Sequence, residues 1–374
     1  MPKRYSNRKL KGLPIPKEIL IKSLSQYIDF FSKNNYTNYV FRGEPTNYHS
    51  TIASALRDNT LVDNLKNISP YINMKNEFYR EVYHKLSFEE RKSFLAFAQH
   101  HGIPTNLVDF TKSPIIALYF ACQESTTSTL KFEKERGFVY LKENCFLDIS
   151  TLVEAFPDKN ILNLFADNNE EVYTYFINSI NIYSHLYPSQ FYFYFKNLVS
   201  DLKYHFKDKY SCITKKPFPQ YQDGKYEIDL TINIEELVDD TYPNELELFK
   251  RNKGSFASFY YTLLLKKFLS DILNYTEPVF WLNCIPNFIY NPILAFERGR
   301  NQQGLFLYQS FLYYTDAVYQ SHILSLQRIW PDLILVIENK ESILKDLDFI
   351  GINEKFIYGD YDSIARHLKK KYCS

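Results

Sequence analysis

The chain has 374 residues, and its 44 basic and 43 acidic side chains give a net charge of +1 at pH 7. This balance argues against binding of nucleic acid through the net charge of the protein, although binding through a local basic patch is an open alternative. No stretch has the roughly 18 consecutive apolar residues of a membrane helix, and 45% hydrophobic residues suffice for a sizeable core in one elaborated domain or in two.

The five cysteines are widely spaced, and none forms a Cys-x-x-Cys motif. We therefore expect reduced thiols in a cytoplasmic protein, with neither a disulfide framework nor a thiolate zinc site. The basic residues within 3–11 are not followed by the apolar run of a signal peptide, so we expect a solvated tail there.

In chain order, hydrophobic periodicity first predicts an amphipathic helix from Pro16 to about Lys33. A short alternating segment then predicts a strand over Tyr36–Arg42. Side chains two positions apart share a face of a strand. Arg42 therefore shares a face with Val40 and, if the extended form continues, with Glu44.

A capping box formed by Ser87 and Glu90 predicts the start of the next helix. This helix should reach His101, where Gly102 suits the C-cap and Pro104 prevents continuation. Ser113 followed by proline predicts a further helix over Ile115–Cys122, which should be buried because it is apolar on nearly every side. A strand is expected at Gly137–Leu141.

The segment 148–275 differs from the rest of the chain in composition and pattern. It is rich in Tyr, Phe and Asn, and its hydrophobic periodicity is mostly helical. Its helical pieces are Ile161–Phe165, Val172–Ile182 and Phe191–Phe206, with one strand-like piece at Tyr226–Ile234. Strands are then expected at Pro278–Cys284, Gly304–Tyr308 and Leu333–Ile337. Two short helices are expected near Ser342–Phe349 and Asp362–Lys371.

Polar residues are densest in the segment Gln99–Thr111, which we interpret as a helix end, a rigid turn and a loop. Buried polar side chains need partners, so Thr105, Asp109 and Thr111 either satisfy backbone groups or face a ligand. In the first case Asp109, Thr111 and Ser113 cap the next helix, while His101 lies in the core. In the second, N–H groups at that helix start receive an anion such as phosphate.

A metal site formed by His100, His101 and Asp109 is a third alternative for this segment. We disfavour it because adjacent side chains on a helix point roughly 100° apart.

Two further polar segments carry arginines. In Phe41–Glu44, the planar fork of Arg42 suits a phosphate or a carboxylate ligand, and the alternative is a structural salt bridge to Glu44 or Asp109. The segment Glu297–Gly304 offers two guanidinium groups and two carboxamides. Its alternative is a solvated turn that leads into a strand.

Together these segments resemble the FRG domain, a family named for its Phe-Arg-Gly motif. The resemblance rests on Phe41–Glu44, on the pattern Gln-His-x-Gly-x-Pro-Thr-x-Leu-x-Asp-x-Thr at Gln99–Thr111, and on an arginine followed by Gln-x-Gly-x-Phe, here Arg298 and Gln302–Phe306. Asn106 and Phe110 stand where the family often has arginine and tryptophan.

The resemblance implies a mixed α/β (α+β) fold, with a central mixed sheet flanked by helices and interrupted by a mainly helical, aromatic-rich insertion. The expected division is 1–35 for an N-terminal tail and helix, 36–147 for the first part of the core, 148–276 for the insertion and 277–374 for the second part of the core. The family occurs widely in bacteria, in settings that suggest defence against phage by abortive infection.

Our leading hypothesis is a nucleotide-handling enzyme that consumes NAD as ADP-ribosyltransferases do. The expected ligand-binding residues are Arg42, Gln99, Thr105, Thr111, Arg298 and Gln302. The expected catalytic residues are Arg42, Glu44, His100, His101, Asp109 and Gln303. The chain lacks the glutamate that follows a Ser-Thr-Ser strand in ADP-ribosyltransferases, so Glu44 or Glu297 would stabilise an oxocarbenium-like transition state.

The alternative hypothesis is a non-enzymatic module that recognises a peptide, a nucleotide or a phage component. Its aromatic insertion would then be the contact surface and its motif residues structural. A nuclease is less favoured, because no carboxylates cluster at metal-binding spacing. The expected partner is thus a nucleotide or an unidentified protein. We expect no resident metal, and we expect NAD as a substrate.

Overall fold

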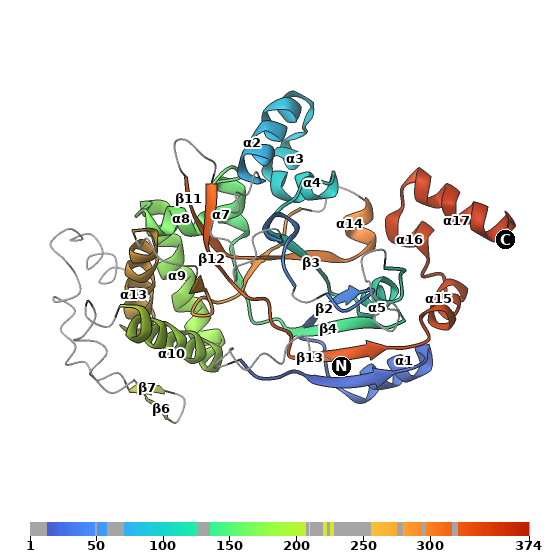
Figure 1. Cartoon of the computed structure of the whole chain (residues 1–374), viewed down its shortest axis with the longest axis horizontal. Coiled ribbons are helices and arrows are strands. Elements are labelled where there is room, and N and C mark those ends of the chain that lie inside the picture. Colours follow the sequence, from blue (N-terminus) through green and yellow to red (C-terminus); the bar gives the residue numbers. More distant parts are fainter. Residues whose placement is uncertain are drawn as a thin grey trace.

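The computed structural model describes residues 13–48, 51–57, 71–125, 135–206, 209, 220–222, 225–227, 256–274, 280–293, 297–315 and 321–373. Its main sheet has eight strands: β1 (Lys17–Ile21), β2 (Tyr39–Glu44), β3 (Leu107–Thr111), β4 (Gly137–Glu143), β5 (Leu147–Asp148), β9 (Phe288–Tyr290), β10 (Gly304–Tyr308) and β13 (Leu333–Ile337). Their spatial order is β1-β13-β4-β2-β3-β10-β9-β5 (Figure 1). The pairs β1–β13 and β5–β9 are parallel and the other pairs antiparallel, so the sheet is mixed, as predicted.

Two smaller sheets accompany it. One has the order β11 (Phe311–Thr315), β12 (Ser321–Leu326) and β8 (Phe280–Trp281), and the other pairs β6 (Gln220–Gln222) with β7 (Lys225–Glu227). Two short 3-10 helices cover Ser54–Leu56 and Tyr83–Lys85.

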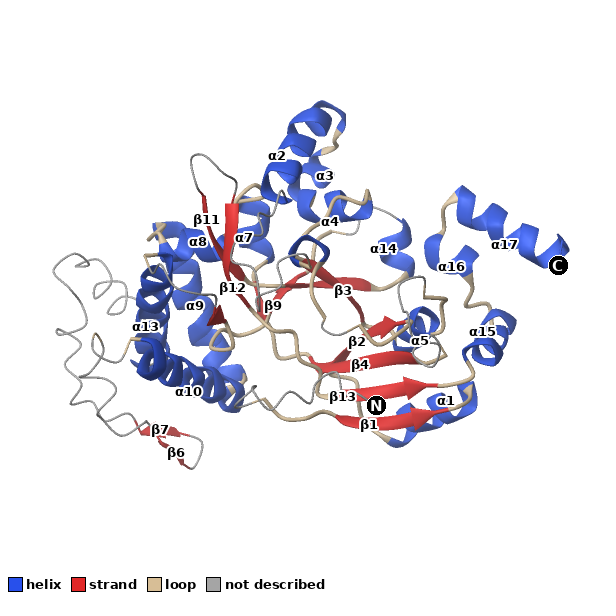
Figure 2. Cartoon of the chain, viewed as in Figure 1, coloured by secondary structure: helices blue, strands red, loops and turns tan. Residues whose placement is uncertain are grey.

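The α-helices lie before, between and after these strands (Figure 2). They are α1 (Leu24–Lys33), α2 (Tyr71–Val82), α3 (Phe88–Lys92), α4 (Phe94–His100), α5 (Pro114–Ala121), α7 (Ser150–Ala155), α8 (Ile161–Ala166), α9 (Glu170–Leu186), α10 (Pro188–His205), α13 (Phe256–Leu273), α14 (Glu297–Asn301), α15 (Lys340–Phe349), α16 (Glu354–Tyr358) and α17 (Tyr361–Cys373). None of those described is long and apolar enough to span a membrane.

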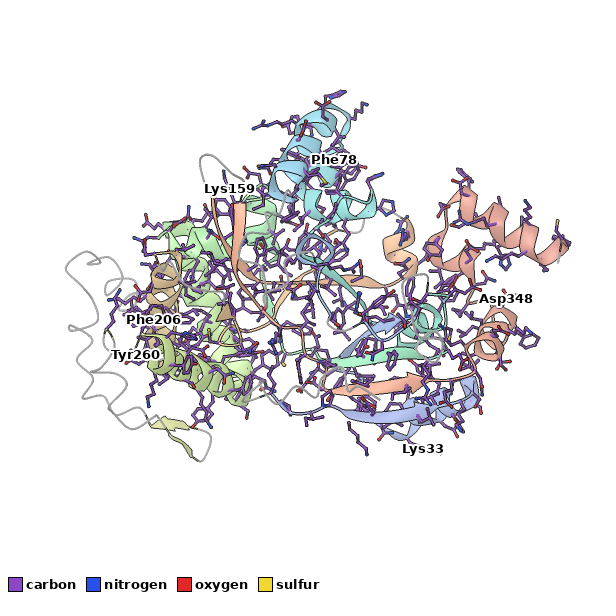
Figure 3. All side chains as sticks on the ribbon, viewed as in Figure 1. Lys33, Phe78, Lys159, Phe206, Tyr260 and Asp348 are labelled. Atoms are coloured by element: carbon purple, nitrogen blue, oxygen red, sulfur yellow. The ribbon has the colours of Figure 1, made fainter. Side chains whose placement is uncertain are left out.

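The mainly helical stretch from α7 to α13 confirms the helical character predicted for this part of the chain. Figures 1 and 2 show α8, α9, α10 and α13 gathered at the left of the molecule, and Figure 3 shows Phe206 and Tyr260 among them. Their apolar side chains form one buried core with Phe288, Tyr290 and Phe306 of the main sheet. The aromatic richness of this stretch therefore fills a core that the helices share with β9 and β10.

A second core lies between the main sheet and α1, α5 and α15. It contains Phe41, Val139 and Leu335 from three neighbouring strands, together with apolar residues of α5 and α15. The helix α5 is apolar on all sides, and five of its eight residues are buried, as its sequence predicted. This packing fixes the position of β2, the strand that carries Arg42.

The single helix predicted over Pro16–Lys33 is wrong. Residues Lys17–Ile21 form β1, which pairs in parallel with β13, and the helix starts only at Leu24. Ser23 is its N-cap, because its hydroxyl accepts a hydrogen bond from the backbone N–H of Gln26. The partner strand lies more than 300 residues away in the chain, so local periodicity could not indicate it.

The loop predicted before Ser113 is also wrong in its last part. Leu107–Thr111 forms β3, in the middle of the sheet between β2 and β10. The segment Glu297–Gly304, for which a solvated turn was one alternative, contains the helix α14. The structure also adds β11, β12 and α16, and it places β2 at Tyr39–Glu44 instead of Tyr36–Arg42. Of the strand predicted over Tyr226–Ile234, residues 228–234 lie outside the described residues.

The signals at helix ends are confirmed more closely. Ser87 and Glu90 form the predicted reciprocal capping box. The helix that they open breaks at Ser93 into α3 and α4 and ends at His100. Gly102 has φ +83°, a left-handed conformation that glycine adopts without strain. Its N–H bonds to the carbonyl of Gln99 over 3.1 Å, which closes the helix.

Candidate functional site

The strand β2 and the helix α5 are in direct contact at Gly43. A Cβ atom added to Gly43 would lie 1.9 Å from the carbonyl oxygen of Ala117 and 2.8 Å from the backbone nitrogen of Ala121. No side chain fits in that space. The glycine of the Phe-Arg-Gly motif is therefore the residue that allows α5 to pack on β2, beside Arg42.

Glu44 and Asp109 both accept hydrogen bonds from the guanidinium of Arg42. Its Nε donates to Oε1 of Glu44, and its Nη1 donates to the backbone carbonyl of Asp109, each over 2.8 Å. Glu44 is only 2% exposed. The predicted alternative of an Arg42–Glu44 salt bridge is thus present, whereas the contact with Asp109 is to its main chain and not to its carboxylate.

A chain of hydrogen bonds joins α4 to β3. Gln99 Nε2 donates to Oδ1 of Asp109 over 2.7 Å, and the hydroxyl of Thr105 donates to Oε1 of Gln99. The same hydroxyl oxygen accepts the backbone N–H of Leu107. These bonds fix which way the Gln99 amide points, and they hold the Asp109 carboxylate at the surface of β3.

The segments Gln99–Thr111 and Arg298–Gly304 meet in space, as the resemblance implied. Thr111 and Gly304 are paired residues of β3 and β10. The Thr111 hydroxyl donates to the carbonyl of Gln302 over 2.7 Å, and Lys112 N–H donates to the carbonyl of Gln303 over 3.2 Å. Thr111 Oγ1 also accepts the N–H of Ser113. It is therefore Thr111, and not Asp109 or Ser113, whose side chain bonds to the backbone at the start of α5.

The helix α14 is attached on its other side to α16. Asn301 Nδ2 donates to the carbonyl of Phe356, and Gln302 Nε2 donates to the carbonyl of Ile357. The guanidinium carbon of Arg298 lies 4.8 Å from the ring centroid of Tyr358, a cation–π contact. Among side chains that the structure describes, no carboxylate forms an ion pair with Arg298.

Between these elements lies a pocket of about 290 Å³. The predicted site residues that line it are Arg42, Gln99, His100, Asp109, Thr111, Arg298 and Gln302. Four predicted residues are not among the lining residues: Glu44, His101, Thr105 and Gln303. Glu44 and Thr105 support Arg42 and Gln99 from behind, because both are buried and bonded to them.

His100 and His101 differ in their surroundings. The pKa of His100 is lowered from its ordinary value of 6.5, first by burial and then by the positive charges of His101 and Arg298. At neutral pH the His100 imidazole is therefore uncharged and able to accept a proton. His101 is exposed, with its ring centroid 4.3 Å from that of Phe97, so the alternative in which it lies in the core is wrong.

Sequence reasoning missed several apolar residues of the pocket, among them Phe41, Phe120 and Phe306, and it missed Tyr358 behind Arg298. Phe41 and Phe306 lie within the quoted motifs, and Phe120 lies in the helix predicted over Ile115–Cys122, so all three could have been found there. Nothing in the sequence near Tyr358 indicates its contact with Arg298.

The pocket combines two guanidinium groups, one carboxylate, one neutral imidazole and two carboxamides with aromatic rings. Asp109 is the one carboxylate among its lining residues, as far as the described part of the chain shows. The described residues contain no group of three His, Cys, Asp or Glu side chains placed to hold a metal ion. Ionic and hydrogen-bonding recognition of a small polar ligand is the chemistry that this arrangement can perform.

The family model of the FRG domain matches residues 37–129. No curated protein and no solved structure matches the chain. The matched residues contain β2, α4, β3 and α5, and therefore Arg42, Gln99, His100, Asp109 and Thr111 of the pocket. The wall formed by Arg298 and Gln302 lies outside the match. Residues 37–129 of this chain are an FRG domain, as the motif order predicted.

Proposed function

We propose that this pocket binds a nucleotide through its phosphates, and that the protein is an ADP-ribosyltransferase-like effector of bacterial defence against phage. The observation that carries the proposal is that Arg42 and Arg298, which are 256 positions apart, line the same pocket. Guanidinium groups bind phosphate oxygens with paired, charge-assisted hydrogen bonds. Arg298 is the stronger candidate for direct contact, because Arg42 is already engaged by Glu44.

The size and lining of the pocket support a compact ligand with one flat, apolar part. Small-molecule pockets have volumes of roughly 300–1,000 Å³, and this one, at about 290 Å³, lies at the lower end. It suits a mononucleotide or one half of a dinucleotide, whose base or nicotinamide would lie against rings such as Phe120. NAD would then extend from the pocket into solvent.

The proposed reaction breaks the bond between the nicotinamide nitrogen and C1′ of the ribose, so that neutral nicotinamide leaves with the bonding electrons. The Asp109 carboxylate stabilises the positive charge that develops at the ribose. An acceptor oxygen or nitrogen, or water, then bonds to C1′, and its proton passes to the neutral imidazole of His100. The carboxylate role falls to Asp109 because Glu44 is buried against Arg42.

The contacts of the motif residues also favour a second function, a binding module without catalysis. Arg42, Gln99 and Gln302 all donate side-chain hydrogen bonds to other protein atoms. Residues held in this way form rigid walls for a recognition pocket, and such a pocket needs no catalytic turnover to act as a sensor of nucleotides.

The test compares the wild-type protein with Arg298→Gln and with the control Arg300→Gln. Arg300 is exposed on the same helix and does not line the pocket. We expect ADP-ribose to bind the wild type in calorimetry. Arg298→Gln should bind about 10–100-fold more weakly, since a charged hydrogen bond contributes roughly 1.5–3 kcal/mol. Arg300→Gln should bind as the wild type does.

A parallel assay measures nicotinamide release from NAD in vitro and the NAD content of cells that express each variant. Release that depends on Arg298 and on Asp109 supports the enzyme, with Asp109→Asn as the variant that separates binding from turnover. ADP-ribose binding without release supports the binding module. Equal binding by wild type and Arg298→Gln, or no binding at all, would contradict the proposal that this pocket binds a nucleotide.

A further inference from the structure

The C-terminal helix α17 is attached to the rest of the protein along one side only. Ser363 is buried, and its N–H and hydroxyl both bond to the carboxylate of Asp360 over 2.8 Å. Arg366 bonds to Glu354 of α16 over 2.7 Å, and His367 Nε2 lies 4.0 Å from Oδ1 of Asp348. Asp348 is labelled in Figure 3, and Figure 1 shows α17 projecting from the right side of the molecule.

The other side of α17 is apolar and uncovered. Tyr361 is 91% exposed, Leu368 43% and Tyr372 77%. With Ala365, also exposed, these residues are spaced by four, three and four positions, which places them in one row along a helix. Single exposed apolar residues are ordinary on a protein surface, but a continuous row on a projecting helix is typical of a binding surface.

The charge of α17 indicates what kind of surface would cover this row. The helix carries the cations Arg366, Lys369, Lys370 and Lys371 against the single carboxylate of Asp362. Arg366 and Lys370 pair with Glu354, whereas no described carboxylate forms an ion pair with Lys369 or Lys371. Two copies of α17 packed together would bring like charges close, so a second copy of this chain is a poor occupant.

We propose that α17 binds a different protein, by inserting Tyr361, Leu368 and Tyr372 into an apolar groove whose rim carries carboxylates. This is the helix-in-groove mode of recognition, in which apolar side chains anchor the helix and charges at the rim select the partner. A helix of 13 residues has marginal stability in water by itself. A groove around its outer face therefore stabilises the helix as well as binding it.

The docked partner would lie next to the proposed nucleotide pocket. The helix α16 precedes α17 directly and accepts the hydrogen bonds of Asn301, the last residue of α14, and of Gln302, which follows it. A partner on α17 would thus sit close to the wall that carries Arg298. The docking surface does not depend on which ligand the pocket binds, and it is tested separately.

The first experiment replaces Tyr372 with the photo-crosslinking amino acid p-benzoylphenylalanine in living cells. The same replacement of Tyr204, which is 83% exposed on α10, is the control. We expect one protein to be crosslinked at position 372 and not at position 204, and mass spectrometry identifies it. No adduct above the control would overturn the proposal, as would an adduct with a second copy of this chain.

The second experiment measures the affinity of the identified protein for purified variants. We expect Leu368→Asp, and separately the double variant Lys369→Glu/Lys371→Glu, to bind at least about tenfold more weakly. The exposed control Lys203→Glu should bind as the wild type does, and affinity should fall with added salt. Unchanged binding by the charge-reversed variant contradicts an acidic rim. Flotation of the wild type, but not Leu368→Asp, with anionic lipid vesicles would identify a membrane as the occupant instead.

Discussion

The Nε of Arg42 lies 2.8 Å from Oε1 of Glu44, two residues further along the same strand. The side chain of Glu44 is 3% exposed and that of Arg42 16%. Both charged groups are therefore largely shielded from water, and each stabilises the other. The arginine of the Phe-Arg-Gly motif therefore stabilises the fold in addition to any contact that it makes with a ligand.

Removing Arg42 should consequently unfold the protein more easily. We expect Arg42→Ala to lower the free energy of unfolding by about 3–5 kcal/mol, because it removes the guanidinium that pairs with the buried Glu44 carboxylate. Arg298→Gln should change it by less than about 1 kcal/mol, because that side chain pairs with a ring and not with a buried carboxylate. Urea denaturation measures both. Equal midpoints for wild type and Arg42→Ala would show that the pair adds nothing to stability.

Gly43→Ala should also be destabilising, for a steric reason. The new methyl group would lie 1.9 Å from a backbone oxygen of α5, and backbone atoms cannot rotate away as side chains do. Overpacking costs roughly 1–3 kcal/mol and occasionally more, and the short distance places this substitution at the upper end. In the control Gly304→Ala, the nearest atom is 3.5 Å away. Thermal unfolding of the two variants makes the comparison, and a similar melting temperature would contradict the close packing of α5 on β2.

The pKa of His100 should lie below 6.5 and should depend on Arg298. Because the positive charge of Arg298 helps to lower it, Arg298→Gln should raise this pKa toward 6.5, whereas Arg300→Gln should leave it unchanged. NMR titration of the imidazole protons measures the pKa directly. A bound anionic ligand should raise the pKa as well, since it offsets the charge of Arg298.

The lowered pKa also predicts how stability depends on pH. Below pH 6.5 the unfolded chain binds a proton at His100 more readily than the folded protein does, so stability increases with pH in this range. The contribution of His100 is fully present above pH 6.5 and is lost as pH falls through the lower pKa of the folded state. Replacing His100 with asparagine should remove this part of the slope. An unchanged slope would show that burial does not affect the imidazole.

The capping box at α3 offers a test of local stability at residues that do not line the pocket. Ser87→Ala should cost about 1 kcal/mol, because the N–H of Glu90 loses its hydrogen-bond acceptor. Glu90→Ala removes the return bond to the N–H of Ser87. A double-mutant cycle should find the two effects less than additive, since each bond holds the other in place. Strict additivity would mean that the two bonds act independently.

The parts of the fold that were predicted from sequence depend on short-range signals. Ser87, Gly102 and the Ser113-Pro114 pair lie next to the elements that they start or end, and the strands Gly304–Tyr308 and Leu333–Ile337 were predicted with the observed bounds. The errors at Lys17–Ile21 and Leu107–Thr111 have a different origin. Both segments become strands through pairing with residues far away in the chain, and no local pattern reports such pairing.

The same distinction holds for the site. The resemblance to the FRG domain implied that the motifs of Arg42, Asp109 and Arg298 meet, and the structure places all three residues around one pocket. The resemblance could not separate residues that face the pocket from residues that support them, because Glu44 and Thr105 have the same chemical character as a ligand-binding residue. Their supporting role follows from their burial and their bonds to Arg42 and Gln99, which only the folded chain defines.

The order of strands in the main sheet also has a consequence for protein synthesis. β13 lies between β1 and β4, and β10 covers β3, so residues made late occupy positions between and beside residues made early. A ribosome that has not reached α14 carries a chain without Arg298 and without β10 and β13, so the edges of β3 and β4 lack these partners. We therefore expect truncated products to aggregate through these edges, and a cell to acquire the pocket only when translation has nearly finished.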